Sequence, residues 1–192
     1  MKWYWMIGAL LVCSCKENLK QTIYTNTTPV IPAITLRSDN LNLKLVNGQW
    51  FYHDTLLSGR LEDFYTSGIL KSRQSFYKGR EEGWLIEWFE SGQIASQRYY
   101  RVGEKEGVHK GWWENGMPRF TYHFSSGKYH GDFSEWMENG QLAKQIIYKD
   151  GNEVSGKAWR DNGKLYMSFE VRDGRRYGLM NAKPCYSLKS EK

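Results

Sequence analysis

The chain has 192 residues, of which 40% are hydrophobic and 16% aromatic, with a formal net charge of +6. Nine Trp, 13 Tyr and 19 Gly against four Pro favour strands and turns over helices. The mean hydropathy of −0.68 indicates a soluble body with a thin core. No stretch has the roughly 20 apolar residues that a membrane-spanning helix needs.

The N-terminus differs in character from the rest of the chain. Lys2 provides a positive charge, residues 3–12 carry none, and Ser14-Cys15 follows. This pattern is typical of a secretion signal, and we expect a signal peptide over residues 1–14; the alternative is a buried N-terminal strand or helix. The segment resembles the bacterial lipobox, in which a small residue precedes a cysteine that is lipidated after cleavage. The resemblance implies a lipid anchor on Cys15, which would hold the protein on a membrane without a spanning helix.

Two further segments precede the main body of the chain. Residues 15–40 are polar and rich in Thr, which predicts a tether between the lipid and the folded body. In residues 41–58, positions 41–46 alternate apolar and polar side chains, Asn47-Gly48 is a hairpin turn signal, and residues 49–52 resume as a strand. We expect an N-terminal capping hairpin there.

Residues 59–178 are organised by repetition. Glycines recur there in three series at intervals of 22 to 25 residues. The first series is Gly68, Gly92, Gly116, Gly140 and Gly163; the second is Gly79, Gly103, Gly127, Gly151 and Gly174; the third is Gly59, Gly83, Gly107, Gly131, Gly156 and Gly178. Such turn glycines allow the positive φ of tight turns, which a helix does not need.

Two series of large side chains accompany the glycines and are the predicted repeat core. Four residues before the first series stand Phe64, Trp88, Trp112, Trp136 and Trp159. Three residues before the second series stand Phe76, Tyr100, Phe124, Tyr148 and Val171. The sequence therefore predicts an all-β protein, an elongated single twisted antiparallel sheet of about five hairpins of 24 residues each. We expect each ring to pack on the equivalent ring one repeat away.

One residue after the first ring series lies a second set of apolar side chains, Tyr65, Phe89, Trp113 and Met137. Because neighbouring residues of a strand point to opposite faces, we expect these four on the second face of the sheet. That face is either a binding surface or a second layer of core. Residues 179–192 fall outside the repeat and are expected to form a C-terminal cap or tail.

The repeated unit, Gly-x4-aromatic-x3-Gly followed by a Tyr-x2-Gly return, is seen in residues 83–92 and again around residues 135–140. It resembles the MORN repeat, and more closely the bacterial variant found in YwqK-family antitoxins. The resemblance covers residues 48–178. It implies an extended β-sheet that acts as an interaction surface, with no shared catalytic residue.

The candidates for metal or acid–base chemistry are few. The spacing of the four histidines matches no common metal motif, so we expect solvent-facing strand or turn residues: His53, His109, His123 and His130. No metal site is predicted from them. Met167, Met180 and Cys185 suggest a copper(I) site as an alternative, because thioether and thiolate ligands select that ion. No phosphate loop, dinucleotide fingerprint or nucleophile elbow is present, so we expect neither an enzyme nor a cofactor.

Together these observations predict a membrane-anchored lipoprotein of the bacterial cell envelope, at the outer membrane or cell surface rather than the inner membrane. Its repeats would form a non-catalytic scaffold that binds a protein or an envelope component. Nucleic-acid binding is not expected, because the export signal argues against it and acidic residues are mixed with the basic ones. Two alternatives stay open: an antitoxin or immunity protein that neutralises a partner by binding, and a copper-handling accessory protein.

Overall fold

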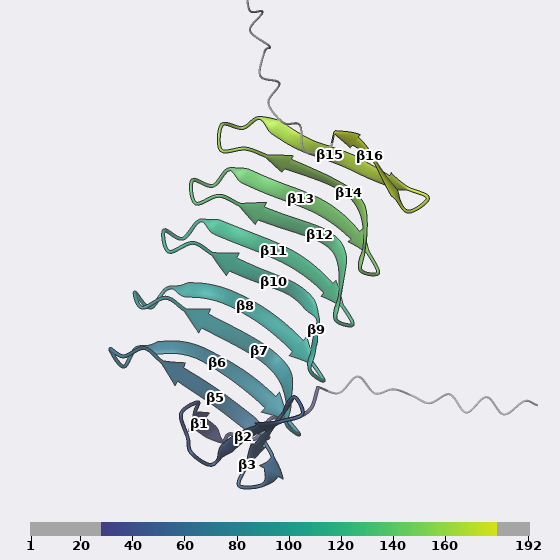
Figure 1. Ribbon diagram of the computed structural model, residues 1–192. Helices are drawn as coiled ribbons and strands as arrows, with labels where there is room; N and C mark the ends of the chain where they lie inside the picture. Colours follow the sequence, from purple (N-terminus) through teal and green to yellow (C-terminus); the bar gives the residue numbers. More distant parts are fainter. Residues whose placement is uncertain (1–27, 180–192) are drawn as a thin grey trace, which may run out of the picture.

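The computed structural model describes residues 28–179, which form strands joined by turns and irregular segments and contain no helix (Figure 1). The strands are β1 (Thr35–Arg37), β2 (Leu43–Val46), β3 (Gln49–Tyr52), β4 (Thr55–Leu56), β5 (Gly59–Phe64), β6 (Leu70–Tyr77), β7 (Arg80–Trp88), β8 (Ile94–Arg101), β9 (Glu104–Lys105), β10 (Gly107–Trp112), β11 (Pro118–Ser125), β12 (Lys128–Trp136), β13 (Leu142–Lys149), β14 (Asn152–Trp159), β15 (Leu165–Arg172) and β16 (Arg175–Leu179). Cys15 and the proposed signal peptide lie outside the described residues.

The main sheet contains thirteen strands, and from β5 to β16 the strands lie side by side in chain order, with short β9 pairing beside β8 (Figure 1). Every neighbouring pair in that run is antiparallel, which confirms the predicted stack of hairpins. One strand departs from the prediction, because β1 pairs parallel to β5, with Thr35 opposite Arg60. The sheet is therefore mixed at its N-terminal end and open rather than closed.

The turns follow the second glycine series, as illustrated by the turn between β8 and β9. Val102 and Gly103 both have positive φ, 53° and 83°, and together they form its two central residues. This is the backbone of a tight two-residue hairpin turn whose twist matches that of the strands. Asn47-Gly48 makes the same kind of turn between β2 and β3.

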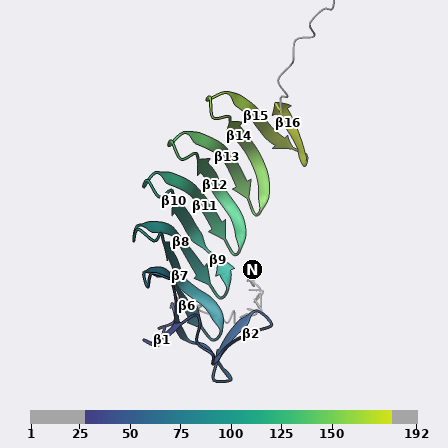
Figure 2. The same ribbon diagram turned by 60° about the vertical axis from the view of Figure 1, so that its left-hand side comes forward.

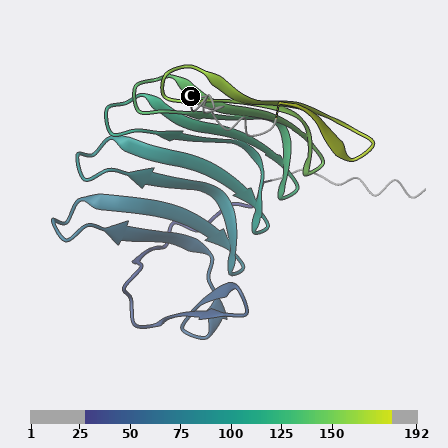
Figure 3. The ribbon, with the colours of Figure 1, turned by 45° about the horizontal axis from the view of Figure 1, so that its top comes forward.

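A register shift occurs at the same place in each of the five repeat hairpins, at the end of its first strand. It falls between Asp63 and Phe64, Glu87 and Trp88, Gly111 and Trp112, Glu135 and Trp136, and Ala158 and Trp159. Such bulges bend a strand and increase its twist. The hairpins accordingly stack into a curved and twisted ladder, which Figure 2 and Figure 3 show from two further directions.

The small three-stranded sheet β2-β3-β4 covers the N-terminal end of the main sheet. Leu57, Leu61 and Phe76 form a buried cluster against which Trp50 of the small sheet packs. The backbone N–H of Trp50 also donates to the carbonyl of Gly79, in the turn between β6 and β7, at 2.9 Å. The other end is different, because all five residues of β16 are exposed.

The third glycine series lies directly across the strand pair from the return-strand rings. Gly59 pairs with Phe76, Gly83 with Tyr100, Gly107 with Phe124 and Gly131 with Tyr148. Aromatic side chains opposite glycines compensate for the missing side chain in a sheet. In the last repeat the buried side chain is Phe169, which lies opposite both Gly156 and Gly178, and not the predicted Val171.

The predicted direct packing of each ring on its counterpart one repeat away is wrong in detail. His109 lies between Tyr100 and Phe124, with ring centroids 5.7 and 4.6 Å away. Tyr129 bridges Phe124 and Tyr148 in the same way, at 4.6 and 4.9 Å. The repeats are thus joined by intervening rings, because equivalent residues on successive hairpins are two strands apart.

Candidate binding site

A pocket of about 710 Å³ opens on one face of the sheet over β8 to β13. Seven of its fifteen lining residues are Trp, Tyr or Phe: Tyr100, Trp113, Phe120, Tyr122, Phe124, Tyr129 and Trp136. Only Ala143 and Met137 supply aliphatic side chains. Its volume lies in the range of pockets that bind small organic ligands, roughly 300–1,000 Å³.

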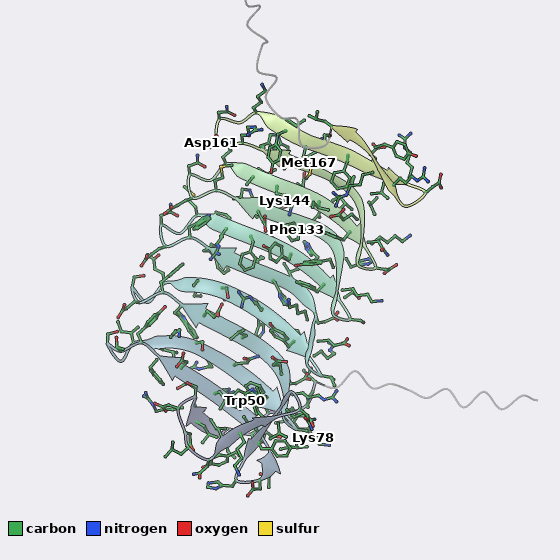
Figure 4. The ribbon with its side chains drawn as sticks, in the orientation of Figure 1. Trp50, Lys78, Phe133, Lys144, Asp161 and Met167 are labelled. Atoms are coloured by element: carbon green, nitrogen blue, oxygen red, sulfur yellow. The ribbon has the colours of Figure 1, made fainter. Side chains whose placement is uncertain are left out.

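The floor of the pocket is a stack of rings set by strand alternation. Phe120 and Tyr122 point to the same face of β11 because they are two residues apart, and their rings stack at 4.5 Å with an interplanar angle of 13°. Tyr122 also stacks on Phe133 of the next strand, at 4.3 Å. Lys144 lies over Phe133, 5.0 Å from its centroid, on the same face (Figure 4). Phe120 and Tyr122 thus line the pocket, and Phe133 supports Tyr122 from the next strand.

Two polar groups of the pocket are held among its aromatic rings. The hydroxyl of Tyr122 donates to Oε1 of Glu135 at 2.7 Å. Burial, and secondarily the Glu135 carboxylate, raises the pKa of Tyr122 well above its usual range. The hydroxyl consequently stays protonated at neutral pH, and its hydrogen bond fixes the Glu135 carboxylate at the pocket.

The second such group is His109, which is 2% exposed. Its Nε2 contacts the carbonyl of Tyr99 at 2.9 Å. Burial lowers the pKa of His109, so the imidazole is neutral at pH 7 and Nε2 donates. The prediction that the histidines face solvent is therefore wrong for His109, because its ring fills the gap between Tyr100 and Phe124. His53 and His130 are exposed, as predicted.

Three cations line the pocket, each above an aromatic ring. Arg98 lies 5.8 Å from the Phe120 centroid, Lys105 lies 5.1 Å from Phe124, and Arg119 lies 5.0 Å from Trp113. Arg98 also pairs with the Glu87 carboxylate at 3.1 Å. Within residues 28–179, neither Lys105 nor Arg119 forms an ion pair. Their charges are thus available to a ligand.

The side chains predicted to form a second face do not follow simple alternation. Trp136 and Met137 are neighbours in sequence, yet both line the pocket together with Trp113. Met137 lies beyond the end of β12, in the turn where its backbone N–H donates to the carbonyl of Gln141 at 2.9 Å, so strand alternation does not apply to it.

Two side chains of the predicted second face form hydrogen bonds that connect successive repeats. Nε1 of Trp113 donates to the carbonyl of Trp136 at 3.1 Å, and the Tyr65 hydroxyl donates to the carbonyl of Trp88 at 2.8 Å. These side chains therefore stabilise the stack as well as lining its surface. The remaining predicted residues at these strand ends are half-buried: Phe64, Phe89, Trp112 and Trp159.

The glycine series and the rings at fixed distances from them did not predict several pocket residues, namely Phe120, Tyr122, Tyr129 and Glu135. A signal for two of them exists, because Phe120, Tyr122 and Phe124 alternate along one strand. Their meeting with Tyr129 and Glu135 depends on the register of β11 against β12.

Residues 28–179 contain neither a metal-binding cluster nor a membrane-spanning helix. Nowhere in that range do three or more His, Cys, Asp or Glu side chains converge to hold a metal ion. The range likewise holds no helix of the length and apolarity required to cross a membrane. Met167 lies on β15 on the same face as Ala158, its cross-strand partner (Figure 4), while Met180 and Cys185 lie outside the described residues.

One hairpin of the stack matches a known protein family. Residues 129–150 match the MORN repeat variant. The matched residues cover most of β12, all of β13 and the first residue of the turn that follows, and they include Tyr129, Glu135 and Trp136 of the pocket. The register shift of the MORN hairpin recurs in the other hairpins, which supports a protein built of MORN-type repeats. No curated protein shows a significant match to the chain.

Proposed function

We propose that this protein is a non-catalytic binding scaffold, and that the ring-lined pocket over β8 to β13 is its recognition surface. The observation that carries the proposal is the concentration of seven aromatic side chains and two unpaired cations in one pocket. The MORN-type hairpins beneath it form a preorganised sheet, so little conformational entropy is lost when a ligand binds.

Binding rather than catalysis is supported by how the titratable groups of the pocket are engaged. His109 is enclosed by rings and bonded to a backbone carbonyl, and Glu135 is bonded to Tyr122. A general acid or base needs a group that reaches the reacting atom. These two side chains instead shape and orient the pocket wall.

We further propose that the scaffold is displayed from the bacterial cell envelope through a lipid on Cys15, with the segment between Cys15 and β1 as the tether; the predicted tether of residues 15–40 is shortened because Thr35–Arg37 pairs with β5. The support for this part is the N-terminal sequence, in which an uncharged segment precedes Ser14-Cys15. Mass spectrometry of the mature amino terminus tests it. An acylated Cys15 in the membrane fraction is the expected result, and an intact Met1 in the soluble fraction would refute the anchor.

The binding function is tested by capture with the full chain immobilised on a resin. A detergent extract of the producing cells is passed over wild-type protein, an Arg119→Ser variant and an Arg172→Ser control, followed by cross-linking and mass spectrometry. Arg119 and Arg172 are both exposed, and only Arg119 lines the pocket. We expect material retained by wild type and the control to be lost from Arg119→Ser; equal retention by all three would exclude the pocket as the recognition surface.

A further inference from the structure

The chemistry of the pocket specifies its ligand more closely, provided that the proposed binding function holds. Arg119 precedes the ring stack at one end of β11, and Lys105 covers Phe124 near the other end. Arg119 and Phe124, the residue that Lys105 covers, are separated by roughly 17 Å along an extended strand. Both side chains are exposed and have no carboxylate partner among the described residues. An elongated ligand with more than one anionic group matches this arrangement.

The position of the pocket disfavours an extended peptide as that ligand. Peptides that add to a sheet bind at an edge strand, where backbone N–H and C=O groups are free. The pocket lies over β8 to β13, in the interior of the sheet, where strands pair on both sides. A helical peptide lays an apolar face into a hydrophobic groove, whereas five of the fifteen lining residues here are charged.

The composition of the pocket matches a carbohydrate instead. A sugar ring presents an apolar face of C–H groups, which carry slight positive charge and are attracted to the negative face of an aromatic ring. Its hydroxyl groups both donate and accept hydrogen bonds. Trp113 and Trp136 offer aromatic surface, while the Glu135 and Glu138 carboxylates accept and the cations donate. An acidic sugar adds carboxylates that can form charge-assisted bonds with lysine and arginine.

We propose that the pocket binds a short acidic oligosaccharide, with its carboxylates on Lys105 and Arg119 and its sugar rings against Trp113 and Trp136. The inference names the ligand class of the proposed scaffold. The Glu135–Tyr122 pair then holds an acceptor in place for sugar hydroxyls. Because the pocket continues over several strands, it recognises an internal stretch of a polysaccharide as well as a free fragment.

The test is a calorimetric titration of the full chain with trigalacturonate, a trisaccharide of uronic acids, at physiological ionic strength. We expect saturable binding with a Kd below the millimolar range. Lys105→Gln and Arg119→Gln should each weaken the affinity about tenfold, which corresponds to one charge-assisted hydrogen bond. Lys164→Gln removes an exposed charge outside the pocket and should leave the affinity unchanged.

Two other probes separate this ligand class from simpler explanations. The neutral trisaccharide maltotriose should bind at least tenfold more weakly than trigalacturonate, and equal binding would refute the role of the two cations. A pentaglutamate peptide should not compete; if it binds as tightly, the site recognises negative charge alone and the carbohydrate assignment fails.

Absence of trigalacturonate binding at millimolar concentration, or binding that both pocket variants retain in full, would also overturn the inference. These results differ from a failure of the scaffold itself. If the Arg119-dependent capture from extract succeeds while trigalacturonate fails, the binding function stands and only the ligand class is wrong.

Discussion

The carboxylate of Glu82 accepts a hydrogen bond from the backbone N–H of Val102 at 2.8 Å, twenty residues further along the chain. The relationship recurs in the neighbouring repeats, as Ser58 with Lys78, Glu106 with Ser126 and His130 with Asp150. In each case the acceptor precedes a glycine of the third series, and the donor begins a turn with positive φ. Each of these four turns is therefore hydrogen-bonded to a side chain of the preceding repeat.

Replacing Glu82 tests how much this connection stabilises the stack. Glu82 is 3% exposed, so Glu82→Ala removes a buried acceptor and leaves the Val102 N–H without its partner. We expect a loss of about 1–3 kcal/mol in the free energy of unfolding, measured by urea denaturation. Glu114→Ala, at an exposed turn position, should change it by less than about 0.5 kcal/mol. Equal effects would show that the Glu82 bond contributes nothing specific.

Val102 should be a position where substitution stabilises the protein. Its φ is 53°, a conformation that costs an ordinary residue about 1–2 kcal/mol and is especially unfavourable for a β-branched side chain. Val102→Asn keeps the backbone N–H and favours this turn. We expect a gain of about 1 kcal/mol, visible as a higher Tm. The control is Val154→Asn, an exposed position inside β14, where asparagine should be neutral or unfavourable.

Gly111 is required because Phe120 occupies the space beside it. A Cβ at Gly111 would lie 2.2 Å from the Phe120 ring, which itself stacks on Tyr122. Gly111→Ala should therefore cost about 1–3 kcal/mol through overpacking. The double variant Gly111→Ala/Phe120→Leu provides the check, because a smaller side chain frees the space. Thermal denaturation should show that the two changes cost less together than the sum of the single changes, whereas simple additivity would exclude the proposed steric conflict.

His109 should make stability depend on pH. Its pKa in the folded protein is lowered below the ordinary value of 6.5, chiefly by burial and further by the nearby charges of Lys105 and Arg98. The unfolded chain therefore binds the proton more readily. The contribution of the neutral, buried His109 to the free energy of unfolding is therefore fully present above pH 6.5. It is lost as the pH falls from 6.5 towards the lower pKa of the folded state.

The measurement is Tm between pH 7.5 and 5.0 for wild type and His109→Phe. The variant keeps a ring between Tyr100 and Phe124 but cannot titrate, so its Tm should fall less over this range than that of wild type. Parallel curves for the two proteins would show that other groups cause the acid sensitivity.

The hairpin stack could be predicted from the sequence because its determinants are local and periodic. A glycine at each turn and a ring three or four residues before it are sufficient to place strands and turns, since both follow from short-range backbone preferences. The match of residues 129–150 to a MORN repeat variant agrees with that periodicity.

The pocket and its residues were decided only by the tertiary structure. The turn after β12 brings Met137 to the same pocket as Trp136. The pairing of β10, β11 and β12 buries His109 and stacks Tyr122 between Phe120 and Phe133. The parallel pairing of β1 with β5 depends likewise on residues 25 apart in the chain. Alternation along one strand fixes which residues share a face. Which rings meet across strands depends on register, and register is set by bulges and neighbours that no single repeat contains.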